Sequence, residues 1–172
     1  MLAVYEVRVF PDFEQAVMLS CTFDIPDPQP LPATGQKVGI DLGLRDFLVL
    51  SNGERIPNPE DMNVHEQRLK CYQRILARKQ RGSANRVKAT LKAASRRARV
   101  ADARGDFLDK TSTDLIRRFD GIAVEDLAVR NMVRNCCLAE LISRSGWGEF
   151  GALLIFETQR YGRILVLVDR FS

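Results

Sequence analysis

Two apolar stretches that end in acidic residues carry the side chains of this sequence best suited to chemistry. Residues 38–44 contain Asp41 near the end of an apolar run, and residues 121–127 end in Glu125 and Asp126. If both stretches are strands of one sheet, Asp41 and Glu125 lie side by side, where like charges repel and a divalent cation is the usual remedy. The pattern therefore predicts a Mg²⁺ site with Asp41 and Glu125 as its ligands.

Other interpretations of these acids stay open. Asp41 also suits a capping or turn position, and if Glu125 is a solvated strand end then Asp126 is as good a candidate. The Asp-Leu-Gly turn at Asp41 occurs as well in actin-like ATPases and sugar kinases, where it handles phosphate. Those proteins need a second such hairpin and an adenosine pocket, for which 172 residues are few.

A strongly basic segment is the second feature. Residues 66–104 hold 13 of the 26 Lys and Arg residues but two of the 22 acids, so this segment carries +11 and the remainder −7. A solvated helical face normally mixes signs, whereas this imbalance favours a polyanion such as nucleic acid. Such contacts position the phosphate backbone without reading sequence. The basic residues expected to contact nucleic acid are Arg74, Arg78, Arg81, Lys88, Lys92, Arg96 and Arg99.

The elements that must position these residues follow from periodicity and turn signals. Alternating apolar residues predict a β-hairpin over residues 2–25, followed by a stiff Pro-rich linker up to residue 32. Strands are expected at 38–44 and 47–53, with a short third strand at 54–59. Helical spacing then runs over 61–119, broken at Gly82-Ser83 into a hairpin, with Gly105 as a candidate second interruption.

The remaining chain predicts a strand at 121–127, a helix at 146–161 stopped by Gly162, and a last buried strand at 163–169. The predicted order of elements is three strands, helices, a strand, a helix and a strand. This is the opening order of the ribonuclease H-like (RuvC-type) α/β fold. A mixed sheet with helices on both faces accounts for such continuous apolar strands.

Packing stripes are also predicted for the helices. One stripe of the second helix is expected to pack against the first helix, because its small residues allow close approach: Val87, Leu91, Ala94, Ala98 and Ala101. Aromatic residues at helical spacing are expected in the core rather than stacked on bases: Trp147, Phe150 and Tyr161.

Composition excludes several classes of protein. No apolar run approaches the about 18 residues of a membrane span, and the first residues lack the pattern of a signal peptide. The four cysteines, Cys21, Cys71, Cys136 and Cys137, show no C-x-x-C spacing. A zinc site is therefore not expected, and free thiols in a reducing cytoplasm fit better.

Several motifs, taken together and in order, resemble the TnpB or OrfB family of transposon-encoded nucleases, which are relatives of type V CRISPR effectors. The resemblance is carried by residues 38–44, the basic pair of helices, Gly105-Asp106-Phe107-Leu108 with Lys110, Val124-Glu125-Asp126-Leu127, Asn131-Met132, Gly146-Trp147-Gly148-Glu149-Phe150 and Val168-Asp169-Arg170-Phe171.

The resemblance implies an RNA-guided DNA endonuclease with a RuvC-like domain, and hence DNA and guide-type RNA as partners. By position, Asp41 matches the acid of the first RuvC motif and Glu125 that of the second, so the resemblance implies that both are catalytic residues. Residues 1–32 resemble the end of a wedge-type barrel with its linker, and residues 33–172 a RuvC-like domain whose basic helical insertion spans about 61–104.

Departures from the family shape the functional prediction. Members of the family continue, after a stretch like 168–171, into a four-cysteine zinc ribbon and a third catalytic acid, which this sequence does not contain. The sequence is therefore interpreted as incomplete at the C-terminus and cleavage-deficient alone, with nucleic-acid binding retained. The alternatives are an active Mg²⁺-dependent endonuclease completed by a second chain, or a homodimer formed through an uncovered sheet face.

Overall fold

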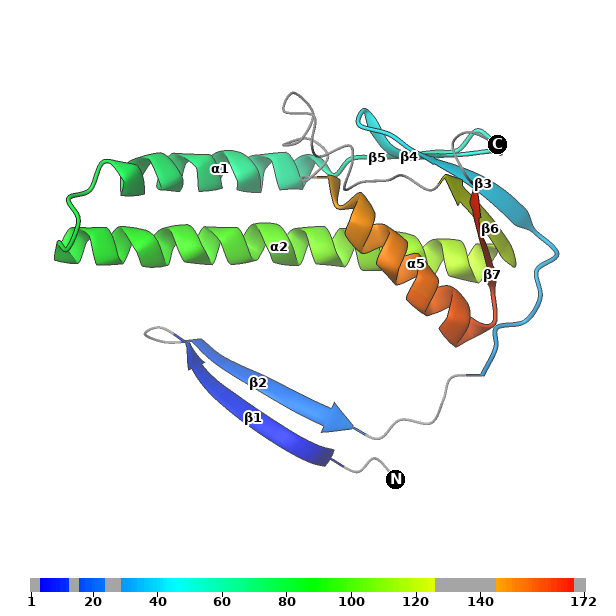
Figure 1. Cartoon of the computed structure of the whole chain (residues 1–172), viewed down its shortest axis with the longest axis horizontal. Coiled ribbons are helices and arrows are strands. Elements are labelled where there is room, and N and C mark those ends of the chain that lie inside the picture. Colours follow the sequence, from blue (N-terminus) through cyan, green and yellow to red (C-terminus); the bar gives the residue numbers. More distant parts are fainter. Residues whose placement is uncertain (1–3, 13–15, 24–28, 126–144, 169–172) are drawn as a thin grey trace.

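A five-stranded mixed sheet with helices packed on one face forms the main body (Figure 1). The structure is a computed structural model, and it describes residues 4–12, 16–23, 29–125 and 145–168. The strand order is β5-β4-β3-β6-β7, in which β3 runs antiparallel to β4 and parallel to β6. The strands are β3 (Lys37–Leu42), β4 (Asp46–Leu50), β5 (Arg55–Pro57), β6 (Gly121–Glu125) and β7 (Ile164–Val168). The chain is thus α/β, as predicted.

Helices α1 (Glu60–Ala77) and α2 (Ala84–Arg118) form an antiparallel hairpin that projects well past the sheet (Figure 1). Gly82 adopts a positive φ of 80° in the connection, and the Ser83 side chain caps α2 by accepting from the Arg86 N–H at 3.2 Å. The predicted break at Gly82-Ser83 is therefore confirmed. The candidate interruption at Gly105 is wrong, because Gly105 lies within the 35-residue helix α2.

The core lies between the sheet and the second half of α2 together with α5 (Trp147–Tyr161). Phe47 of β4 is fully buried and makes edge-to-face contacts with Phe107 at 4.9 Å and Phe150 at 5.1 Å, measured between ring centroids. Each such large side chain contributes about 1.5–3 kcal/mol by leaving water. Trp147 and Phe150 are core residues, as expected.

The line of contact between α1 and α2 differs from the predicted stripe. Ala89, Ala93 and Val100 are buried on α2, whereas Val87 is 59 % exposed. Ala94, Ala98 and Ala101 of the predicted stripe are also exposed. Small residues do mediate the close approach, but the seam is rotated by roughly one residue from the predicted one.

Strand β7 is not the buried strand that its apolar sequence predicted. It forms one edge of the sheet, and Ile164, Val166, Leu167 and Val168 are 42–61 % exposed. Within the described residues, helices cover one face of the sheet; this differs from the expected cover on both faces. An edge strand with one open face keeps little of its apolar surface away from water.

A separate two-stranded sheet lies at the N-terminus, where β1 (Val4–Asp12) pairs antiparallel with β2 (Ala16–Phe23). The predicted hairpin is confirmed. Its origin in a wedge-type barrel, and the domain boundary at residue 32, stay predictions. No helix in the described parts of the chain is long and apolar enough to cross a membrane.

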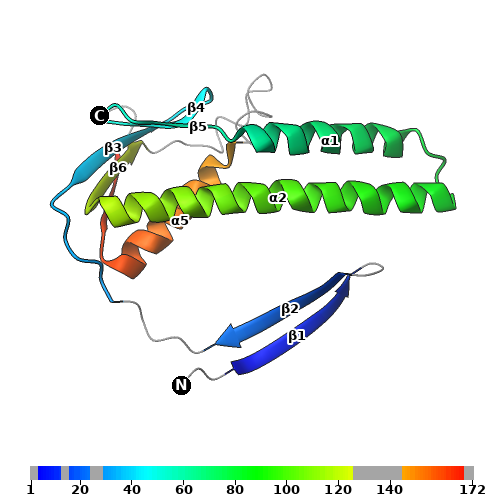
Figure 2. The ribbon, with the colours of Figure 1, turned by 180° about the vertical axis from the view of Figure 1, so that it is seen from behind.

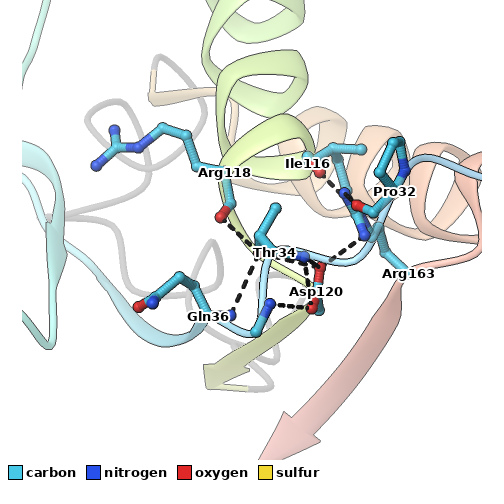
Figure 3. A network of polar contacts seen from close by, with 8 residues as sticks. Pro32, Thr34, Gln36, Ile116, Arg118, Asp120 and Arg163 are labelled. Carbon is cyan, nitrogen blue, oxygen red and sulfur yellow. Dashed lines mark hydrogen bonds and ion pairs between the residues drawn. The ribbon is translucent and has the colours of Figure 1, made fainter.

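A polar network fixes the linker against the end of the sheet where β3, β6 and β7 begin (Figure 3). Asp120 accepts hydrogen bonds from the backbone N–H groups of Thr34 and Gly35 at 2.7–3.0 Å. Arg163 donates to Asp120 at 2.7 Å and to the carbonyl oxygens of Ile116 and Pro32 at 3.0 Å. The network therefore fixes the start of β3 and, through it, the position of Asp41 in the sheet.

Candidate functional site

Asp41 and Glu125 occupy equivalent positions at the ends of neighbouring parallel strands. Ile40 of β3 pairs with Val124 of β6 in the parallel register, so the next residue on each strand is Asp41 and Glu125. Ile40 and Val124 are buried, while Asp41 is exposed and Glu125 half-buried, because side chains alternate between the faces of a strand. The two acids therefore lie beside each other on the open face of the sheet.

Close contacts fix the conformation of the turn that follows Asp41. Gly43 donates a backbone hydrogen bond to Phe47 at 3.1 Å, and a Cβ at Gly43 would lie 2.8 Å from the Asp46 carbonyl oxygen. The Asn58 side chain donates to the carbonyl oxygens of Leu44 and Arg45 at 2.9 and 3.2 Å. Backbone packing and one amide thus hold the end of β3 and its carboxylate in place.

The donor set suits a hard cation. Carboxylate oxygens are the ligands that Mg²⁺ prefers, usually one or two per ion with waters completing the octahedron. Asp41 and Glu125 meet that requirement for one ion. Among the described residues no group of three or more His, Cys, Asp or Glu side chains could hold a metal. Asp126 and the vicinal pair Cys136-Cys137 lie outside the described residues.

A shallow groove of about 340 Å³ is lined by residues of β3, β6 and β7 that precede these acids in the strands. Gly39, Gly121 and Ala123 form its floor, and Ile164 and Val166 form one side. The small residues at these floor positions leave this part of the sheet low, and Lys37 also lines the groove.

Most of the basic side chains of the hairpin are exposed to solvent. Ten Lys and Arg side chains between Glu66 and Arg104 are exposed; they are Arg68, Lys70, Arg74, Arg78, Lys79, Arg81, Lys88, Lys92, Arg97 and Arg99. Six of these were predicted to contact nucleic acid. The other four, Arg68, Lys70, Lys79 and Arg97, were not among the predicted contact residues. Figure 2 shows how far the hairpin extends beyond the sheet.

Three arginines of this segment have structural roles instead. Arg96, one of the predicted contact residues, is half-buried and stacks over Tyr72 of α1 at 5.4 Å from the ring centroid. Arg86 donates to the carbonyl oxygens of Leu76 and Lys79 at the end of α1. Arg104 lies 3.9 Å from Glu66, which is one of the two acids in the segment and is buried. The exposed charge of residues 66–104 is therefore almost purely cationic.

Comparison with known proteins assigns the chain to a family. The sequence model of the OrfB_IS605 family, described as "Probable transposase", matches residues 20–136. The chain belongs to this family, known as TnpB or OrfB, which confirms the resemblance.

Two curated relatives bear names that describe an activity. A "Putative RNA-guided DNA endonuclease" of Streptomyces pristinaespiralis is 45% identical over 142 residues, which cover 83% of this chain and 35% of the relative. A "Putative RNA-guided DNA endonuclease InsQ" of Escherichia coli K12 is 29% identical over 117 residues, covering 68% of this chain and 29% of the relative. The chain thus spans about a third of the length of these relatives.

Proposed function

We propose that this chain is a nucleic-acid-binding protein of the TnpB/OrfB family, with a partial RuvC-like site at Asp41 and Glu125. The observation that carries the proposal is the segment 66–104 of the hairpin α1–α2, which exposes ten cationic side chains while one of its two acids, Glu66, is buried. DNA and guide-type RNA are the partners, in keeping with the names of both curated relatives.

The hairpin acts on the phosphate backbone. Cations spread along two long helices neutralise successive phosphates and release counterions, which gives affinity without sequence preference. Arg74, Arg78 and Arg81 lie towards the end of the hairpin, and Lys88, Lys92 and Arg99 follow one flank of α2 beside its buried seam. Within a RuvC-like domain spanning 33–172, we assign the hairpin as the basic insertion at about 61–104.

Asp41 and Glu125 are the residues that would hold Mg²⁺. A bound Mg²⁺ ion polarises a phosphoryl oxygen and lowers the pKa of its water, which is the chemistry of metal-dependent phosphodiester hydrolysis. The fold supports this role because both carboxylates end adjacent strands on one open face. Ribonuclease H-like architecture is supported by the same sheet order and by the parallel pairing of β3 with β6.

We infer that the chain alone binds without cleaving. Two-metal hydrolysis depends on carboxylates that hold both ions, and the described part of the site supplies two such groups. The alternative is an active endonuclease completed by a second chain, for which the open face of the sheet that carries the two acids leaves room. A nick in plasmid DNA by the purified chain with Mg²⁺, lost in Asp41→Asn, would refute the inference.

The binding proposal is tested by fluorescence anisotropy with labelled single-stranded DNA and RNA at several salt concentrations. We expect the logarithm of affinity to fall steeply with the logarithm of salt, by about 0.7 per phosphate contact. Replacing Arg74, Arg78 and Arg81 together by Gln should reduce that slope by about 2. A matched variant with Lys110, Arg117 and Arg160 replaced by Gln removes the same charge from exposed sites outside the basic segment 66–104. Equal losses in both variants, or a flat salt dependence, contradict the proposal.

A further inference from the structure

Strand β7 presents an unusually open edge. In the described sheet β6 is its neighbour on one side, and its sequence Ile-Leu-Val-Leu-Val carries no charge, proline or glycine. The opposite edge is different, since β5 has three residues and contains Arg55 and Pro57, both of which discourage pairing with another strand. A free, apolar, β-branched edge is a ready template for a further strand.

The pattern of β7 is self-complementary. If a second β7 lies antiparallel to the first with the two Val166 residues opposite each other, Leu165 meets Leu167 of the second copy, and Ile164 meets Val168. Every pair is then apolar and of similar size. Directly opposed residues point to the same face, so Ile164, Val166 and Val168 of both copies stay together on the open face. A two-fold axis through the Val166 pair produces this register, as expected of an isologous dimer.

The helical side of the edge is apolar too. Glu157 of α5 accepts a hydrogen bond from Thr113 of α2 at 3.2 Å, so this flank of α5 faces α2. Ile155 precedes Glu157 by two residues, about 200° around the helix, and therefore lies on the flank away from α2. Ile155 is 44 % exposed and Leu167, on the helical side of β7, is 54 % exposed. Both are available to contact the same residues of a second copy beneath the joined sheets.

We propose that two copies of this chain form a dimer by antiparallel pairing of their β7 strands, giving a continuous ten-stranded sheet with α5 of each copy side by side on one face. The pairing satisfies the edge backbone groups of β7, which no other described strand than β6 approaches, and covers Ile155, Leu167 and the apolar side chains of its open face. It does not depend on nucleic acid or metal, and so is independent of the function proposed above.

The register is tested with single cysteines in the full chain, after Cys21, Cys71, Cys136 and Cys137 have been replaced by Ser. In an antiparallel pair, Cβ atoms of opposed residues lie about 4.5–5.5 Å apart. Val166→Cys should therefore be joined to itself by a short bifunctional thiol reagent, as covalent dimers in a denaturing gel. Ile164→Cys alone should not react in this way, because two such residues lie four positions, or about 13 Å, out of register. A mixture of Ile164→Cys and Val168→Cys should again give dimers.

Val87→Cys is the matched control, since Val87 is 59 % exposed on α2 and far from the edge in sequence. Sedimentation velocity of the unmodified chain should show a dimer that dissociates on dilution, and Val166→Lys should remain monomeric with an unchanged circular dichroism spectrum. A monomer at all concentrations, equal crosslinking of Val166→Cys and Val87→Cys, or a ladder of species above the dimer would each overturn the proposal.

Discussion

Arg163 and Asp120 form a short ion pair, in which Nη1 of Arg163 lies 2.7 Å from Oδ1 of Asp120. The Arg163 side chain is 3 % exposed, and its other nitrogens donate to carbonyl oxygens at the end of α2 and in the linker. One guanidinium group therefore joins four segments: the linker, the end of α2, the residue before β6 and the residue before β7 (Figure 3).

Replacing Arg163 should destabilise the whole sheet. Arg163→Lys keeps the charge, but an ammonium group on a shorter stem cannot donate in three fixed directions as the planar guanidinium does. Loss of buried hydrogen bonds to a charged donor should lower the thermal unfolding midpoint by about 5 °C or more. Arg160→Lys is the control, because Arg160 is exposed and stacks over aromatic rings of its own helix. Similar midpoints for both variants would show that the network contributes little.

Stability should fall in acid through two carboxylates. Hydrogen bonds from the Thr34 backbone lower the pKa of Asp120, and the hydrogen bond from Arg118 lowers the pKa of Glu54. A folded-state pKa below the unfolded value means that the stabilisation is complete above the unfolded pKa and is lost as pH falls through the folded one. The loss should therefore begin near the ordinary values of 4.5 for Glu54 and 3.8 for Asp120, and continue below them.

Urea unfolding at a series of pH values measures this effect. The midpoint should drop steadily below about pH 4.5, and Asp120→Asn should reduce the drop while lowering the midpoint at neutral pH. Asp106→Asn removes an exposed acid that pairs with Lys110 within α2 and should leave the profile unchanged. An identical pH profile for the unmodified chain and Asp120→Asn would exclude Asp120 as a source of acid sensitivity.

Replacing Gly43 or Gly105 by alanine should change the stability of the chain in opposite directions. At Gly43 a Cβ would lie 2.8 Å from a backbone carbonyl oxygen, so Gly43→Ala must displace the turn after Asp41 and destabilise the chain by about 1–3 kcal/mol. At Gly105 no atom lies within 4 Å of the added Cβ and the residue is inside α2, so Gly105→Ala should stabilise by about 0.5–1 kcal/mol. Denaturant unfolding measures both. Stabilisation by Gly43→Ala would show that the turn has room to relax.

Several elements were predictable because their signals are local. Apolar runs that end in acid predicted β3 and β6, and Gly82-Ser83 and Gly162 predicted where helices stop. The adjacency of Asp41 and Glu125 needs a nonlocal fact, the parallel pairing of β3 with β6, which the order of elements suggested and the register makes specific.

Other features depend on packing that a single stretch does not encode. The cost of one glycine, about 1 kcal/mol, is small beside the contacts of a 35-residue helix, so Gly105 did not interrupt α2. The α1–α2 seam could not be assigned among several alanines of similar size. The exposure of β7 was missed because an apolar strand has the same sequence whether or not a neighbouring layer covers it.

Replacing Glu157 by glutamine should stabilise the chain. Burial between α5 and α2 raises the pKa of Glu157, so the folded state disfavours its charged form. That penalty is present at neutral pH and disappears as pH falls below the ordinary value of 4.5. Glu157→Gln keeps an oxygen that can accept from Thr113, and should raise the unfolding midpoint by about 2 °C at pH 7 but hardly at all at pH 4. Glu149→Gln, at an exposed position in the first turn of α5, should show no gain.

Divalent cations should stabilise the chain through Asp41 and Glu125. A ligand that binds the folded state alone contributes RT ln(1 + [L]/Kd), or about 1.4 kcal/mol at ten times Kd, which is a shift of about 3–6 °C for a chain of this size. Thermal unfolding in Mg²⁺ or Mn²⁺ should show this rise for the unmodified chain and lose it in both Asp41→Asn and Glu125→Gln. Asp114→Asn, at an exposed acid of α2, should keep it. Loss in one variant only would mean that the two carboxylates do not share an ion, and an equal rise in every variant would place the cation elsewhere.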